Sequence, residues 1–152
     1  MSGTNRIPGK GRLTPARTVS FTFDGRVLTG IEGDTIASAL IANGIHLAGR
    51  SFKYHRPRGI LSAGPEEPNA LIDVARGSNT HTPNVRAPVQ EIFEGMVATS
   101  QNRWPSLSFD IGAINNLFSP IFAAGFYYKT FMWPKAAWKH IYVPNMRAAA
   151  GL

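Results

Sequence analysis

The 152-residue chain contains no cysteine. This absence excludes a disulfide framework, a thiol nucleophile, a zinc–thiolate site and an iron–sulfur cluster held by cysteines only. Acidic residues are also few, because nine Asp and Glu stand against 16 Lys and Arg and give a formal net charge of +7. That charge permits an anionic partner, such as a nucleotide phosphate, RNA or an acidic protein surface, without choosing among them.

Long apolar runs are missing as well. No window reaches the roughly 18 to 20 apolar residues that a membrane-spanning helix needs. Residues 1–16 carry Arg6, Lys10 and Arg12 among glycines and prolines, without the apolar stretch of a secretory signal. We therefore expect a soluble, cytoplasmic protein whose residues 1–16 form a flexible arm.

The pattern of an ordered domain begins at Arg17. Val19, Phe21 and Phe23 alternate with polar residues, and the Asp24-Gly25 pair suits the tight turn of a β-hairpin. An amphipathic helix should follow, capped by Asp34 or Thr35 and closed at Asn43-Gly44, with Ile36, Ala39, Leu40 and Asn43 on one face. A hairpin followed by one such helix predicts an α+β fold of the β-grasp (ferredoxin/ubiquitin-like) type over residues 17–100.

Further strands are expected within that domain, from Ala70 to Val74 and near Glu91 to Ala98. After Gln101 the composition changes, since eleven of the 16 aromatic residues lie between Trp104 and Tyr142. Prolines divide this stretch, so only short helical turns are predicted, near Ile111 to Leu117 and from Pro134 to His140. We interpret residues 101–152 as an aromatic-rich, mostly irregular docking extension that leads to a following domain.

The densest positive charge lies in residues 50–58, here called the basic loop. One interpretation is phosphate or nucleic-acid binding, because cations interleaved with aromatic rings grip phosphates and stack on bases. The other is a solvated loop or an interface with another subunit. Neither a Walker pattern nor a G-x-G-x-x-G fingerprint is present. The candidate side chains are Arg50, Lys53, His55, Arg56 and Arg58, with Phe52 and Tyr54 between them.

No set of residues predicts catalysis. The four histidines are scattered, without the paired spacing of metal ligands on one helical face, and are interpreted as structural or surface residues. Glu66 and Glu67 are adjacent, and no matching nucleophile or base accompanies them. We expect this pair to be solvated or to form salt bridges with the preceding arginines.

Several sequence blocks recur together in a known protein family. They include V-S-F-T-F-D-G, E-G-D-T-I-A-S-A-L-I-A-N-G, G-R-S-F-K-Y-H-R-P-R-G-I-L-S-A-G, T-P-N-V-R-A, S-Q-N-R-W-P-S-L, F-S-P-I-F and A-G-F-Y-Y-K-T-F-M-W-P. With these blocks the chain strongly resembles the N-terminal part of the alpha subunit of heterotetrameric sarcosine oxidase. The similarity begins at Thr18 and covers almost all of the chain beyond the N-terminal arm.

This resemblance implies a domain related to 2Fe-2S ferredoxins, in which four cysteines hold the cluster. Carried over to this chain, the cysteine positions fall near Ser62, Glu67, Ala70 and Pro88, here called the cluster positions. None of these residues supplies a thiolate, so iron–sulfur electron transfer is excluded and no metal is expected.

The resemblance also implies a larger enzyme with alpha, beta, gamma and delta subunits. That enzyme uses FAD, FMN, NAD and tetrahydrofolate to oxidise sarcosine with oxygen to glycine and hydrogen peroxide, and the one-carbon unit passes to tetrahydrofolate. We expect this chain to hold no cofactor itself and to act as a structural or assembly module. The alternative is a free-standing basic module that binds RNA or nucleotide, whose affinity would fall steeply with salt.

Overall fold

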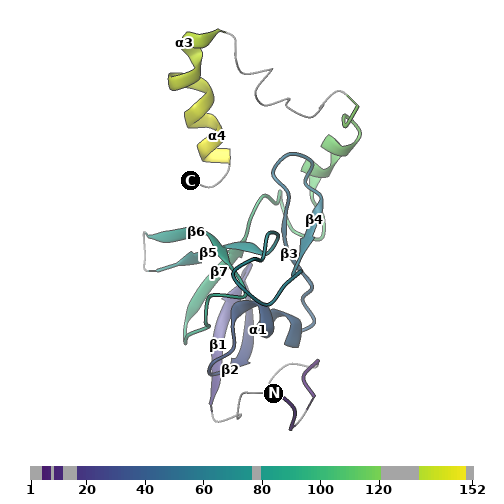
Figure 1. Cartoon of the computed structure of the whole chain (residues 1–152), viewed down its shortest axis with the longest axis vertical. Helices are drawn as coiled ribbons and strands as arrows, with labels where there is room; N and C mark the ends of the chain where they lie inside the picture. The colour runs from purple at the N-terminus through teal and green to yellow at the C-terminus, as the bar shows by residue number, and fades with distance from the viewer. Residues whose placement is uncertain (1–4, 8, 12–16, 77–79, 121–133, 150–152) are drawn as a thin grey trace.

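A computed structural model describes residues 5–7, 9–11, 17–76, 80–120 and 134–149 of the chain (Figure 1). A β-sheet domain forms its body, and a short helical region follows it in the sequence. In chain order the elements are β1 (Thr18–Phe23), β2 (Arg26–Ile31), α1 (Ile36–Ala42), β3 (Leu47–Arg50), β4 (Pro57–Gly59), β5 (Leu71–Ala75), β6 (His81–Arg86), β7 (Met96–Ser100), the 3₁₀ helix η1 (Ile111–Asn116), α3 (Lys135–Ala137), the π-helical η2 (Trp138–Tyr142) and α4 (Val143–Ala149).

The predicted hairpin and helix are both confirmed. Strands β1 and β2 pair up to Phe23 and Arg26, and the two turn residues, Asp24 and Gly25, have φ values of 48° and 78°. Positive φ at both positions is what a primed hairpin turn requires. Thr35 caps α1, since its hydroxyl accepts a hydrogen bond from the Ser38 N–H at 3.2 Å.

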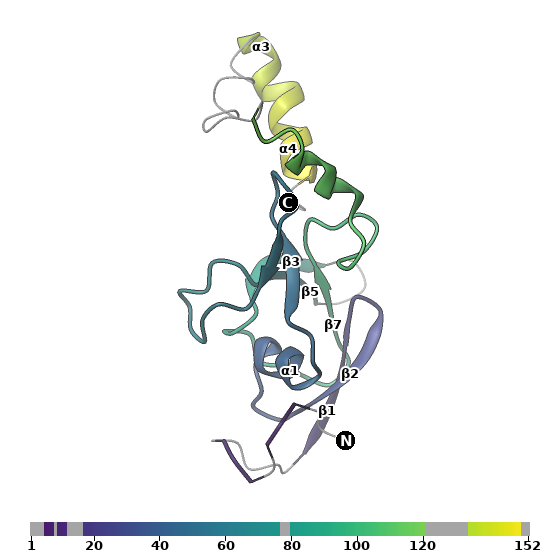
Figure 2. The same cartoon turned by 90° about the vertical axis from the view of Figure 1, so that its right-hand side faces the viewer.

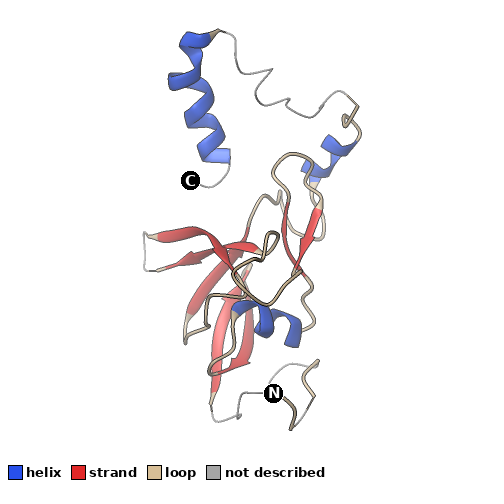
Figure 3. Ribbon diagram, viewed as in Figure 1, coloured by secondary structure: helices blue, strands red, loops and turns tan. Residues whose placement is uncertain are grey.

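The strand order identifies the fold. Five strands form one sheet in the order β2-β1-β7-β5-β6, and β1 and β7 are parallel while the other neighbours are antiparallel. Helix α1 lies across one face of this sheet (Figure 3). A mixed sheet crossed by one helix confirms the α+β, β-grasp prediction.

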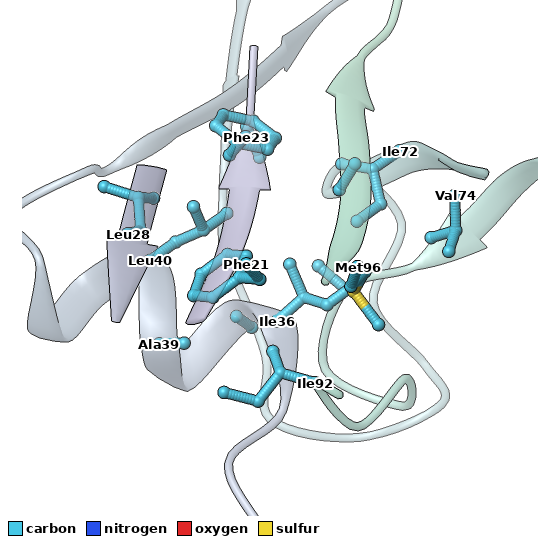
Figure 4. Packing of buried hydrophobic residues seen from close by; sticks show 14 of the residues in the cluster. Phe21, Phe23, Leu28, Ile36, Ala39, Leu40, Ile72, Val74, Ile92 and Met96 are labelled. Carbon is cyan, nitrogen blue, oxygen red and sulfur yellow. The ribbon is translucent and has the colours of Figure 1, made fainter. Parts of the chain in front are cut away.

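The hydrophobic core lies between α1 and the sheet (Figure 4). Ile36, Ala39 and Leu40 of α1 are completely buried, and Phe21 and Phe23 of β1 face them. These are the inward positions of a period-2 strand and of one helical face, which is why the sequence pattern identified them. The side chains that complete the core from other elements include Leu28, Ala48, Ile72, Val74, Ile92 and Met96.

A second, two-stranded sheet carries the basic loop. Strands β3 and β4 pair antiparallel, and residues 51–56 connect them. The Arg50 N–H donates to the Gln101 carbonyl at 3.1 Å, which ties β3 to the segment after β7. Figure 2 shows β3 beside β5 and β7, so the basic loop projects from one end of the main sheet.

Two sequence predictions need correction, and one strand was not predicted. The strand expected over Glu91 to Ala98 begins only at Met96, because Glu94 and Gly95 form a turn in which Gly95 has a φ of 74°. Strand β6 was not predicted, since its sequence is polar and contains Pro83; as an edge strand it tolerates both. The helix expected to end near His140 continues to Ala149, because the π-helical η2 runs directly into α4 and Pro144 does not end the helix.

The described part of the N-terminal arm contacts α1. The Asn5 N–H donates to the Ala42 carbonyl at 3.0 Å, and Arg6 pairs with the buried Asp34 carboxylate. Residues 1–4, 8 and 12–16 lie outside the described residues, so the flexible arm stays a prediction. None of the helices in the described ranges is long and apolar enough to cross a membrane.

Candidate functional site

The basic loop is a closed turn. The Ser51 N–H donates to the Arg56 carbonyl and the His55 N–H to the Ser51 carbonyl, both at 2.9 Å. His55 takes a φ of 51°, a left-handed conformation that is uncommon for residues other than glycine. This turn fixes the directions in which the five candidate side chains leave the loop.

Arg50 and His55 point toward the segment that follows β7. His55 Nδ1 lies 2.8 Å from Asp110 Oδ2, and Arg50 Nε lies 3.7 Å from the same oxygen. Arg50 also donates to the Leu107 carbonyl and, at 3.0 Å, to the His55 carbonyl. Both side chains are therefore engaged with the Asp110 carboxylate.

The Asp110 carboxylate holds this contact together. Its Oδ1 accepts the N–H groups of Trp104 at 3.1 Å and Gly112 at 3.0 Å, while Oδ2 faces His55 and Arg50. The side chain is completely buried. A buried carboxylate needs such partners, because moving an unpaired charge from water into the protein interior costs on the order of several kcal/mol.

Arg56 and Arg58 are exposed to solvent, and Lys53 is half-buried. Arg56 Nε donates to Asn116 Oδ1 at 3.2 Å, and Arg58 donates to Asn69 Oδ1 at 2.6 Å. The Lys53 ammonium and the Arg56 guanidinium each lie 4.8 Å from the centre of the Tyr54 ring, within cation–π range. These three side chains retain positive charge at the surface of the loop.

The helical turn η1 reinforces the same contact. Asn115 and Asn116 donate from their side-chain amides to the carbonyls of Lys53 and Tyr54, at 3.3 and 3.0 Å. Figure 1 shows η1, in green, beside the tip of the β3–β4 connection. Sequence reasoning missed Asp110, Asn115 and Asn116 as partners of the basic loop; Asp110 gave one signal, being the only acidic residue between Trp104 and Tyr142.

A shallow groove opens beside the basic loop. Its volume is about 270 Å³, and its lining mixes two cations, side-chain amides and one aromatic ring. The lining includes Arg50, Phe52, Arg58, Asn69, Gln101 and Asn102. The lining also includes Pro68 and Leu71, so the groove offers both polar and apolar surface.

The four cluster positions come together in space. The Ser62 and Ala70 N–H groups both donate to the Glu67 carboxylate, at 2.5 and 3.2 Å. The N–H of Ala87, the residue before Pro88, donates to the Ala70 carbonyl at 2.9 Å. Both Ala70 and Pro88 are buried. Three of the cluster positions thus meet at the Glu67 carboxylate, and the fourth, Pro88, follows a residue that is bonded to Ala70.

Glu67 occupies the centre of this arrangement. It is only 1% exposed, and its carboxylate accepts four backbone N–H groups, from Leu61, Ser62, Asn69 and Ala70. Burial raises the pKa of Glu67, but the four N–H donors outweigh it and leave the pKa below its ordinary value. The expectation of a solvated or salt-bridged Glu67 is therefore wrong; Glu66, its neighbour, is exposed.

An iron–sulfur cluster does not fit these residues. Ser62 offers a hydroxyl and Glu67 a carboxylate, while Ala70 and Pro88 have no side chain that can bind a metal. A 2Fe-2S cluster needs four thiolate or imidazole ligands. In the part of the chain that the structure describes, no three His, Asp or Glu side chains gather as a metal site. The residues at the cluster positions therefore do not support electron transfer through an iron–sulfur cluster.

Comparisons with known proteins find one domain family and several relatives. A family model described as "2Fe-2S iron-sulfur cluster binding domain" matches residues 16–103. Sarcosine oxidase subunit alpha from Rhizobium meliloti is 62% identical over 147 residues, which make up 97% of this chain and 15% of that protein. The same subunit from Corynebacterium sp. (strain U-96) is 51% identical over 63 residues, 41% of this chain and 6% of that protein.

A solved structure is also similar, that of L-proline dehydrogenase from P. horikoshii. It has a TM-score of 0.48 and 24% identity, and the match covers 60% of this chain and 17% of that one. The fold assignment rests on the strand order instead. The resemblance to the sarcosine oxidase alpha subunit is confirmed by the sequence matches. Because residues 16–103 are more than half of the chain, it belongs to the 2Fe-2S iron-sulfur cluster binding domain family, as a member without cysteine.

Proposed function

We propose that this chain is the N-terminal module of a sarcosine-oxidase-like alpha subunit and serves to assemble that enzyme rather than to catalyse. The observation that carries the proposal is the extent of the similarity, 62% identity over 97% of the chain. It runs far past residue 103, where the family domain ends. A relative that shares both the domain and the extension supports a common place in a larger subunit.

The extension supplies the docking surface in this proposal. Among the described residues after β7, several large apolar side chains are exposed, including Trp104 at 63% and Leu117 at 77%. Contiguous exposed apolar side chains usually mark an interface. The others among the described residues after β7 are Phe109, Ile111, Ile114, Phe118 and Ile141. The occupant that we propose is the remainder of the same subunit, since the chain spans only 15% of its Rhizobium meliloti relative.

The basic loop would then have two tasks. Arg50 and His55 hold the extension through Asp110, and the outward Lys53, Arg56 and Arg58 meet an acidic surface or a cofactor phosphate of the assembled enzyme. The enzyme itself, in this proposal, has alpha, beta, gamma and delta subunits, carries FAD, FMN, NAD and tetrahydrofolate outside this chain, and oxidises sarcosine to glycine and hydrogen peroxide.

The alternative, a free-standing module for RNA or nucleotide, has one observation in its favour. Lys53 and Arg56 flank the Tyr54 ring, and Phe52 is exposed beside them, as a stacking site for bases would require. Against it, Arg50 and His55 are engaged with Asp110 and Leu107, which lowers the charge available for phosphates.

Surface substitutions in the complete enzyme test the proposal. Trp104→Ser with Leu117→Ser should weaken assembly, measured as the fraction of alpha subunit that co-elutes with the other subunits and flavin. Val27→Ser is the matched control, because Val27 is equally exposed, at 76%, and lies on the outer strand β2. Unchanged co-elution of the double variant would contradict the docking role.

A further inference from the structure

One of the cluster positions, which the family resemblance implies, carries a buried negative charge. Glu67 carries it, and the structure records no ion pair between Glu67 and any described Lys, Arg or His. The adjacent Glu66 is exposed, and Arg58 of β4 donates to Asn69 Oδ1 instead. The charge must therefore be stabilised by something other than a cation.

Backbone N–H groups provide that stabilisation from two sides. Leu61 and Ser62, before Glu67, donate to Oε2 at 2.7 and 2.5 Å. Asn69 and Ala70, after it, donate to Oε1 at 2.8 and 3.2 Å. Converging main-chain N–H groups of this kind form anion-binding concavities, which proteins use for phosphates and for iron–sulfur clusters. Here the anion belongs to the loop itself.

The carboxylate has no capacity left for another ligand. Two oxygens offer about four lone-pair directions, and four N–H groups fill them, two at each oxygen. Such charge-assisted hydrogen bonds are also stronger than neutral ones, which accounts for a buried carboxylate without a cation. Glu67 is thus available neither as a general base nor as a metal ligand while the loop is folded.

We propose that the Glu67 carboxylate is the internal anion around which residues 61–70 fold, in the place that an iron–sulfur cluster takes in metal-bearing members of the family. The substitution turns a cofactor loop into a metal-independent structural element. It also explains how the domain keeps its loop between β4 and β5 without any cysteine.

Amide hydrogen exchange measured by NMR on the 152-residue chain tests this proposal. The N–H groups of Leu61, Ser62, Asn69 and Ala70 should exchange slowly in the wild type. Glu67→Gln should speed their exchange at least about tenfold, because the charge that orders them is gone. Glu66→Gln is the matched control, because it removes the same charge from an exposed side chain one residue away. It should leave all four exchange rates unchanged.

Equal effects of the two substitutions, or no effect of Glu67→Gln, would overturn the proposal. If Glu67→Gln does not fold, the wild type still decides: its four amide resonances should shift together as the Glu67 carboxyl is titrated with acid, and independent shifts would refute the proposal. Neither measurement involves flavin or another subunit, so a failure here is distinct from a failure of the assembly role.

Discussion

His55 Nδ1 and Asp110 Oδ2 lie 2.8 Å apart although 55 positions separate the two residues in the sequence. The contact joins the turn between β3 and β4 to the segment that precedes η1. Arg50 approaches the same carboxylate, and the Trp104 and Gly112 N–H groups complete its shell. One buried acid therefore fixes both the basic loop and the start of the exposed apolar extension.

Asp110→Asn should release the extension from the domain. The loss of the charge leaves Arg50 and His55 without their acid and should lower the free energy of unfolding by about 2–3 kcal/mol. Urea unfolding gives the magnitude, and limited proteolysis should cut faster between residues 104 and 116. The control is Glu32→Gln at an exposed acid. Equal protease resistance in wild type and Asp110→Asn would show that Asp110 does not anchor the extension.

Gly112→Ala should break the same contact without changing any charge. A Cβ at this position would lie well inside van der Waals contact of the His55 ring atoms Cε1 and Nδ1. The ring must then move away from Asp110, at a cost of about 1–3 kcal/mol for overpacking. The His55 imidazole resonances report the displacement. An unshifted imidazole spectrum in the folded variant would contradict this packing.

Ser62→Ala should be tolerated or slightly stabilising. The Ser62 hydroxyl is buried and has no hydrogen-bond partner among the described residues. Removing this hydroxyl breaks no hydrogen bond. The free energy of unfolding should therefore stay the same or rise by up to about 1 kcal/mol. Thermal unfolding provides the measurement. A marked loss of stability would mean that the hydroxyl has a partner in solution.

The contribution of Glu67 to stability should depend on pH in a defined direction. Its folded pKa lies below the ordinary value of 4.5, so the unfolded chain binds the proton more readily. The stabilisation is therefore present above about pH 4.5 and is lost as the pH falls through the folded pKa. Urea unfolding of wild type and Glu67→Gln should differ most near neutral pH and converge in acid. A constant difference between pH 7 and pH 3 would exclude this linkage.

Periodic apolar patterns predicted the fold well. Val19, Phe21 and Phe23 alternate along β1, and Ile36, Ala39 and Leu40 recur along α1, so the sequence itself shows which faces are buried. The strand β6 escaped prediction because edge strands need few apolar residues. Its pairing with β5 is a tertiary contact that no local pattern records.

The candidate site was less predictable from sequence. Motif resemblance located the cluster positions, but the partners of Glu67 are backbone N–H groups, which leave no trace in side-chain composition. The adjacent Glu66 is exposed, so an acidic pair in sequence has two different fates in the fold. The contacts of Arg50 and His55 with Asp110 likewise depend on the tertiary fold, which brings Asp110 next to them.

Native mass spectrometry of the complete enzyme, expressed with and without residues 17–118 of this chain, tests the central claim most directly. The assembly role predicts that the shortened alpha subunit no longer forms the full complex with its partner subunits and loses bound flavin and sarcosine oxidation together. A shortened enzyme with the same subunit stoichiometry, flavin content and turnover as the complete one would contradict the claim.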